Sequence, residues 1–207
     1  MKATEILLWA VLLATIVAHP ASAQGTFIYD QQSADESTGG GVAGDIESNQ
    51  PIGQSFTPAL DFVGFIRLRL ADYNSGNGTG TTVYLNLRSD SITGTILAST
   101  EPVFMPDGFG VGTGNRGYTN FFFPQAVAVI PETAYYFQPV VLSGDPCAIA
   151  AYPYNYPRGT AYIQGVASLN DLWFREGIIV PEPSTWLIIV LGAATIFVRF
   201  VRRRSGA

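Results

Sequence analysis

The stretch FIRLRLAD at residues 65–72 alternates apolar and polar side chains with a period of two. In an extended chain Ile66, Leu68 and Leu70 fall on one side, and the two arginines between them fall on the other. A second stretch, TVYLNLRSD at residues 82–90, repeats the pattern. Such alternation is typical of strands that bury one face in a core and expose the other. These two segments therefore predict a sheet with one buried face.

The surrounding sequence indicates more short strands and no helix. No segment between the two ends of the chain combines apolar residues at helical spacing with capping residues. Turn-forming clusters such as NSGNGTG at 74–80 and SGDP at 143–146 separate the apolar segments. Besides the two opening segments, strands are expected at 25–31, 53–57, 95–99, 118–123, 126–130, 134–142, 148–152, 160–164 and 171–176. We predict an all-β fold, an antiparallel β-sandwich of the jelly-roll type, over residues 24–178.

The first 23 residues are typical of a secretory signal peptide. Lys2 gives a positive start, ILLWAVLLATIVA at 6–18 is an apolar core, and ASA at 21–23 supplies the small residues that signal peptidase requires. We expect cleavage before Gln24. The alternative is an N-terminal membrane anchor, for which the apolar run is short.

Removal of this segment leaves a body without histidine or lysine, because His19 and Lys2 are the only ones in the chain. Between residues 24 and 180, six arginines and fourteen acidic residues give a net charge of −8. Such a body is a poor partner for nucleic acid phosphates. It also lacks the residues for a Ser-His-Asp or Cys-His site and for a zinc site. Catalysis by two carboxylates, as in a glycoside hydrolase, is the enzymatic alternative that remains.

The acidic residues near the start of the body raise the question of a metal. Carboxylates in loops are the ligands that calcium prefers, but no contiguous calcium-loop spacing is present. The residues concerned are Asp30, Asp35, Glu36, Asp45 and Glu47. We expect no cofactor, with a structural calcium ion as the alternative.

Cys147 is the only cysteine, so no intramolecular disulfide can form. A small buried thiol and an intermolecular disulfide are the two interpretations of this residue.

The stretch AYPYNYPRGTAY at residues 151–162 is the candidate for ligand binding. Tyrosines at every second position lie on one side of an extended chain, where their rings could stack on sugars. The candidate glycan contacts are Tyr152, Tyr154, Asn155, Tyr156 and Arg158. The alternative is that the tyrosines cover one end of the sandwich core.

The end of the chain, residues 179–207, has three parts in a fixed order. VPEPSTW at 180–186 is kept extended by its prolines, WLIIVLGAATIFV at 186–198 is apolar, and RFVRRRSGA at 199–207 is basic. If Arg199 snorkels, residues 186–201 form a short membrane-spanning helix, with the arginines in the cytoplasm and the body outside.

This tripartite end resembles the PEP-CTERM sorting signal of Gram-negative bacteria, with Arg199 as the one interruption of the apolar stretch. The resemblance implies that an exosortase-type membrane protease recognises Pro181, Glu182 and Pro183. It also implies export across the inner membrane, anchoring by the C-terminal helix, and an association with exopolysaccharide or biofilm matrix at the cell surface.

The body resembles the jelly-roll modules of bacterial surface proteins, which are similar to carbohydrate-binding and galactose-binding-like domains. The segments that carry this resemblance run from QSFTP at 54–58 to DLWFREG at 171–177. We expect an exported, non-enzymatic surface or matrix protein whose sandwich binds polysaccharide. The alternatives are a purely structural adhesive or matrix component without a small ligand, and a carboxylate-based glycoside hydrolase.

Overall fold

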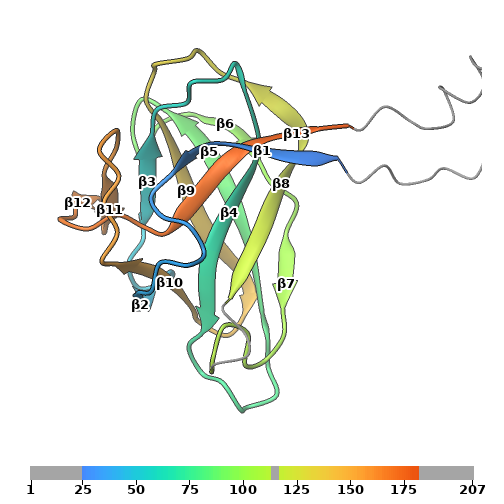
Figure 1. Ribbon diagram of the computed structural model, residues 1–207. Coiled ribbons are helices and arrows are strands. Elements are labelled where there is room, and N and C mark those ends of the chain that lie inside the picture. The colour runs from blue at the N-terminus through green and yellow to red at the C-terminus, as the bar shows by residue number, and fades with distance from the viewer. Residues whose placement is uncertain (1–24, 113–116, 182–207) are drawn as a thin grey trace, which may run out of the picture. The chain divides into compact units, whose positions relative to one another are not determined.

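The computed structural model describes residues 25–112 and 117–181, and these residues fold as two antiparallel sheets (Figure 1). Residues Phe27–Ile179 form one compact unit. Within the described ranges, the chain contains no helix long and apolar enough to cross a membrane. The expected signal peptide at 1–23 and membrane segment at 186–201 lie outside the described residues. The prediction of an all-β fold of two antiparallel sheets is confirmed.

The strands follow the short, turn-separated pattern of the sequence. They are β1 (Thr26–Gln32), β2 (Gly41–Asp45), β3 (Gly53–Phe56), β4 (Phe62–Asp72), β5 (Thr81–Ser89), β6 (Ile96–Ser99), β7 (Val103–Met105), β8 (Tyr118–Ala128), β9 (Tyr135–Gly144), β10 (Cys147–Tyr152), β11 (Ala161–Ile163), β12 (Val166–Ala167) and β13 (Phe174–Val180).

The first sheet is organised around the long strand β4. One edge of β4 pairs with β8. Along the other edge, Phe65–Leu68 pair with β13 and Leu70–Asp72 pair with β10, so these two strands follow each other along a single edge. β1 and β2 complete the sheet beyond β13 and β10, respectively.

The second sheet is organised around the pair of β5 and β9. Residues 81–89 of β5 pair with residues 135–144 of β9 over their whole length. β6 and β7 pair with the other edge of β5, and β3, β11 and β12 continue the sheet beyond β9.

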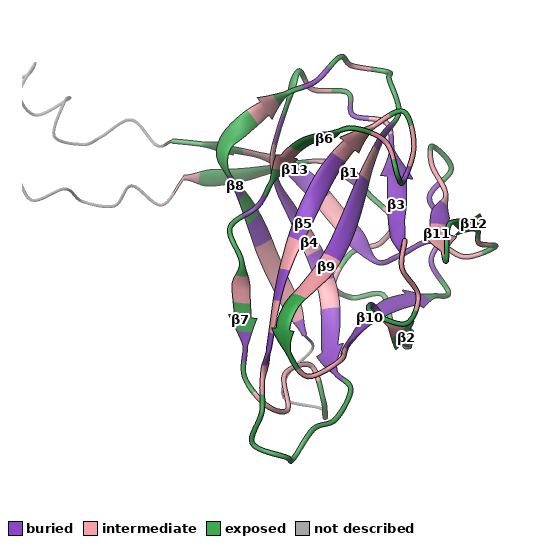
Figure 2. Cartoon of the chain, turned by 180° about the vertical axis from the view of Figure 1, so that it is seen from behind, coloured by how far each residue is buried: buried purple, intermediate pink, exposed green. Residues whose placement is uncertain are grey.

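The core lies between the two sheets. The apolar residues that alternate along segments 65–72 and 82–90 point into it. Ile66, Leu68 and Leu70 of β4 are buried. The alternating apolar residues of β5 are buried as well, namely Val83, Leu85 and Leu87. Figure 2 shows buried residues running along the central strands β4, β5 and β9. Each such side chain contributes about 1.5–3 kcal/mol by leaving water, so the alternation itself specifies how the sheets pack.

The strand assignments differ from the sequence predictions in a few places. The segments expected at 118–123 and 126–130 form the single strand β8. The last strand begins at Phe174 and not at Asp171. Strands β2, β7 and β12 were missed, because they are short and, for β2, rich in glycine.

The segment that connects β10 to β13, residues 153–173, is called the excursion below. Buried hydrogen bonds to Asp171 hold it in place. The Asp171 carboxylate accepts bonds from Gln54 Nε2 at 2.9 Å, Tyr156 N at 2.6 Å and Ala161 N at 3.1 Å. Gln54 Oε1 in turn accepts a bond from Leu172 N at 3.0 Å. Both polar side chains are buried, so this network joins β3, the excursion and the approach to β13 where water does not compete.

We expect Asp171→Ala to lower the free energy of unfolding by about 3 kcal/mol or more, because it leaves several buried donors without an acceptor. The measurement is urea unfolding of residues 24–181. Asp61→Ala, at an exposed position, is the matched control and should change stability by less than about 0.5 kcal/mol. Equal effects of the two substitutions would contradict the structural role of Asp171.

Candidate functional site

The tyrosines of the candidate stretch do not lie on one exposed side. Tyr152 is 60% exposed, whereas Tyr154 and Tyr156 are 3% and 4% exposed. The reason is that β10 ends at Tyr152, and the chain beyond it turns instead of continuing as a strand. The expected platform of three tyrosines is therefore wrong for Tyr154 and Tyr156, and the core-covering alternative describes them.

Both buried tyrosines have structural partners for their hydroxyl groups. The Tyr156 hydroxyl donates to Gln31 Oε1 at 2.8 Å and accepts a bond from Thr57 N at 3.2 Å. The Tyr154 hydroxyl accepts a bond from Arg69 Nη1 at 3.0 Å. Burial raises the pKa of Tyr156. Neither ring is available for a ligand.

The other candidates in this stretch, Asn155 and Arg158, are exposed. Arg158 forms an ion pair with the Glu132 carboxylate across the surface. That pair raises the pKa of Arg158. Tyr152 at the end of β10 and Asn155 in the segment after it remain exposed, and Arg158 is already paired with an acid.

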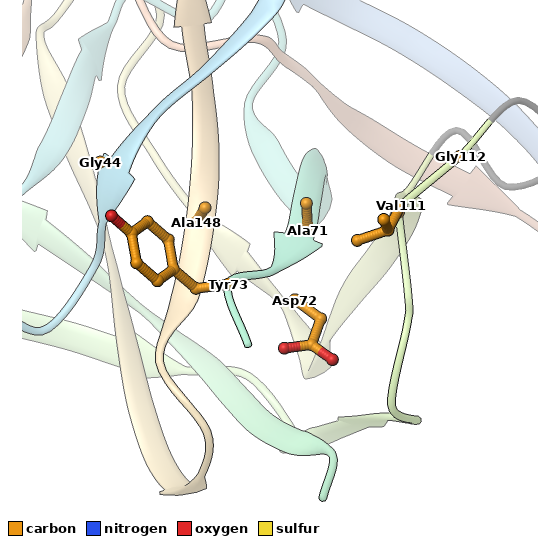
Figure 3. Close-up of a pocket in the computed structure, with 8 residues that line it drawn as sticks. Gly44, Ala71, Asp72, Tyr73, Val111, Gly112 and Ala148 are labelled. Atoms are coloured by element: carbon orange, nitrogen blue, oxygen red, sulfur yellow. The ribbon is translucent and has the colours of Figure 1, made fainter. Parts of the chain in front are cut away.

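A cleft of about 440 Å³ lies elsewhere, between the end of β4, the β2–β10 pair and the loop that follows β7. Figure 3 shows the ring of Tyr73 lying beside Gly44 and Ala148. Tyr73 is 60% exposed, and Val111 adds a second exposed apolar side chain. Sequence reasoning missed this site because Tyr73 is a single tyrosine next to a glycine-rich turn, without the repetition that made residues 151–162 conspicuous.

Close backbone contact shapes one wall of the cleft. Gly110 has a φ of 73°, and a Cβ at this position would lie 2.1 Å from the Leu70 carbonyl oxygen. Only glycine therefore allows the loop after β7 to pack directly on the end of β4. The result is a wall of main chain on the side of the cleft opposite the Tyr73 ring.

The acidic side chain that lines the cleft, Asp72, serves to position loops. Its Oδ1 accepts a bond from Asn74 N at 2.9 Å, and its Oδ2 accepts one from Gly108 N at 2.8 Å. Figure 3 shows the Asp72 carboxylate pointing away from the Tyr73 ring. Nearby Asp107 accepts bonds from Gly76 N and Gly78 N, which lower its pKa. Carboxylate–backbone bonds thus fix the loops around the cleft.

The acids considered as calcium ligands serve separate purposes. Asp35 accepts bonds from Ser37 within its own turn, which lower its pKa, and Glu36 pairs with Arg67 at 2.8 Å. Asp45 accepts a bond from Ser48 N, which lowers the pKa of Asp45. Among the residues that the structure describes, no group of three or more His, Cys, Asp or Glu side chains is arranged to hold a metal ion.

Cys147 is fully buried in the main core. Burial raises the pKa of its thiol to about 12. In the folded body the side chain is a small apolar core residue, and an intermolecular disulfide would require unfolding.

Glu176 of β13 is a buried acid that sequence reasoning did not single out. It is 0% exposed, and neither carboxyl oxygen has a hydrogen-bond partner among the described residues. Burial, followed by the neighbouring Asp30 carboxylate, raises the pKa of Glu176 to about 9. Asp30 itself accepts bonds from Ala59 N and Leu60 N. Glu176 is therefore protonated at neutral pH, beside an Asp30 carboxylate that is held by backbone donors. The sequence offered one signal for this burial. Glu176 lies two residues after the core residue Phe174, and alternate residues of a strand share one face.

The residues expected to act in sorting lie at the end of β13. Pro181 directly follows that strand and is the last described residue, while Glu182 and Pro183 lie outside the described ranges. β1 and β13 are neighbours in the first sheet, so the chain enters and leaves the sandwich on adjacent strands.

Comparison with known families finds the PEP-CTERM protein-sorting motif at residues 180–204. The motif supports an exported protein that is anchored in the membrane and sorted by exosortase, a membrane enzyme, consistent with a Gram-negative envelope. No curated protein matches the chain. A carbohydrate-binding family is not confirmed for the sandwich.

We expect the stability of the body to fall as pH rises from about 4.5 towards 9, because folded Glu176 keeps a proton that the unfolded chain releases. Glu176→Gln keeps the shape without the ionisation, so it should remove this slope and stabilise the body by about 3 kcal/mol at pH 7. The measurement is urea unfolding of both proteins between pH 5 and pH 9. Glu101→Gln, at an exposed position, should keep the wild-type slope. A wild-type slope in Glu176→Gln would show that Glu176 is not the group responsible.

Proposed function

We propose that this chain is an exported, non-enzymatic protein of the cell surface or extracellular matrix, whose β-sandwich binds glycan in the Tyr73 cleft. The sorting motif at 180–204 supports export and handling by exosortase. The observation that carries the binding function is the cleft, in which an exposed tyrosine ring on one side faces a wall of main chain on the other.

The position of the motif suits a processing signal. β13 ends at Val180, where the motif begins, and the buried side chains of the core all come from residues before it. A protease acting after Pro181 would therefore leave the hydrogen bonds of the sandwich intact. Release of a folded body to the surface or matrix follows from this arrangement.

The composition of the cleft favours a sugar. Its volume of about 440 Å³ lies within the range of roughly 300–1,000 Å³ typical of small-molecule sites. Sugar rings have apolar faces that stack on tyrosine, and their hydroxyl groups bond to main-chain and carboxylate oxygens. Tyr73 supplies the ring face, while the glycines of the loop after β7 leave the main chain accessible.

Two features of the same cleft favour binding over hydrolysis. Among the residues that line it, Asp72 is the only acid, and both of its oxygens already accept backbone hydrogen bonds. A glycoside hydrolase needs a second carboxyl group across the scissile bond. A purely structural matrix component without a ligand is the second candidate function, favoured by the burial of Tyr154 and Tyr156.

We expect Glu182→Ala in the full chain to block processing, because it removes the one charged group of the Pro-Glu-Pro segment. In a host that carries exosortase, the variant should remain in the membrane fraction at full length. Mass measurement of the protein from each cell fraction makes the comparison, with Thr185→Ala as the control from the same segment. Processing of Glu182→Ala at the wild-type level would contradict recognition of this segment.

We expect Tyr73→Ala to weaken glycan binding by residues 24–181 at least about tenfold, because it removes the stacking surface of the cleft. The measurement is a polysaccharide pull-down and glycan array. Tyr152→Ala is the matched control, since both tyrosines are 60% exposed. Loss in the Tyr152 variant alone would move the site to residues 151–162. No binding by the folded wild-type body would favour the purely structural function.

A further inference from the structure

Among the residues that the structure describes, strand β1 forms an edge of the first sheet. It is the last strand of the first sheet beyond β13, so in the described structure it has a neighbouring strand on one side only. Phe27, Ile28 and Tyr29 are all exposed, although each is a large apolar side chain. Further along the strand, the Asp30 carboxylate accepts hydrogen bonds from Ala59 N and Leu60 N. The free part of β1 is therefore short, residues 26–29. A hydrophobic edge of this kind is a template for pairing with another strand.

The outer face of the sheet beside this edge carries a row of aromatic rings. Phe27 and Tyr29 contact Phe65 with ring centroids 5.0 Å and 5.5 Å apart, and Phe65 contacts Phe122 at 6.4 Å. Gly177 of β13 lies between β1 and β4, and a Cβ there would lie 1.9 Å from the Ile28 carbonyl oxygen. Phe65 is buried, while Phe27, Tyr29 and Phe122 remain exposed, so the row extends to the free edge.

The free part of β1 carries no protective residue of its own, although the Arg175 guanidinium of the neighbouring β13 stacks on the Tyr29 ring at 3.4 Å. The sequence of this free part, TFIY at 26–29, contains no proline, lysine or other charged residue. A segment with high β-propensity and no charge favours addition of a strand.

We propose that β1 pairs with β1 of a second copy of this chain, in antiparallel orientation, to join two first sheets edge to edge. The sequence around Ile28 is complementary to itself in this orientation. With Ile28 opposite its own copy, Phe27 lies opposite Tyr29, and Thr26 lies opposite Asp30. Aromatic cross-strand pairs stabilise a sheet, and no two like charges face each other in this register.

The pairing is weak and reversible, because the free part of the strand is short. A few main-chain hydrogen bonds and the aromatic pairs oppose the repulsion between two acidic bodies. Interfaces below roughly 1,000 Å² belong to transient complexes. The dimer should therefore form over a range of about 10–500 µM and strengthen when salt screens the charge.

The test is analytical ultracentrifugation of residues 24–181, a range that contains the whole compact unit, from about 5 to 500 µM. Wild-type protein should shift from monomer to dimer, and Ile28→Lys should raise the dissociation constant at least about tenfold. Ile130→Lys is the matched control, because Ile130 is an exposed apolar residue on a loop and the charge change is the same. It should dimerise like the wild type. Amide exchange in β1 should slow with concentration in the wild type and not in Ile28→Lys.

A wild-type body that stays monomeric over this range would overturn the proposal, as would a dimer unaffected by Ile28→Lys. The competing occupant of the edge is a lipid surface. It would be indicated by a monomeric body that sediments with phosphatidylcholine vesicles in an Ile28-dependent way, and that result would also overturn the proposal. The midpoint of thermal unfolding of Ile28→Lys should be close to that of the wild type. This control shows that loss of the dimer does not result from loss of the fold.

Discussion

The buried carboxylate of Asp171 is the constraint on which the arrangement of the second half of the chain depends. It accepts hydrogen bonds from one side chain of β3 and from two backbone positions in the excursion after β10. A polar segment can lie against the core only if its backbone donors find partners there. Because Asp171 supplies them, the chain turns inward at Tyr154 and Tyr156 and then enters β13 in register with β4. The burial of those two tyrosines, which removes them as ligand contacts, is a consequence of this network.

The register of β13 has further consequences along the strand. Phe174 enters the main core, Glu176 follows on the same face, and Gly177 lies where β1 approaches most closely. One strand therefore places a neutral carboxylic acid inside the sandwich, and its Gly177 allows β1 to approach so closely that the rings of β1 reach Phe65 on the outer face. The same strand leads directly to the sorting motif. The cleft of Tyr73 lies at the end of β4 that pairs with β10, away from the residues that pair with β13.

The sequence was sufficient to predict the elements whose side chains alternate regularly. Period-two patterns located β4 and β5 and their buried residues, because one face of each strand lies entirely in the core. The same rule failed at residues 152–156, where it assumed an extended chain and three tyrosines on one side. The backbone there is decided by Asp171 and Gln54, which are distant in sequence, and no local pattern reports such a contact. The Tyr73 cleft was missed for a related reason, since it forms where the end of β4, the β2–β10 pair and the loop after β7 meet.

The most direct test of the constraint set by Asp171 is native-state amide hydrogen exchange at Tyr156 and Ala161, whose N–H groups donate to its carboxylate. Neither residue pairs with a long strand. A segment of this kind that was held only loosely would exchange its amides rapidly. We predict that these two amides exchange as slowly as those in the centre of β4, because they open only when the sandwich opens. Rapid exchange at both positions would show that the excursion is held loosely. It would contradict the conclusion that the Asp171 network buries Tyr154 and Tyr156.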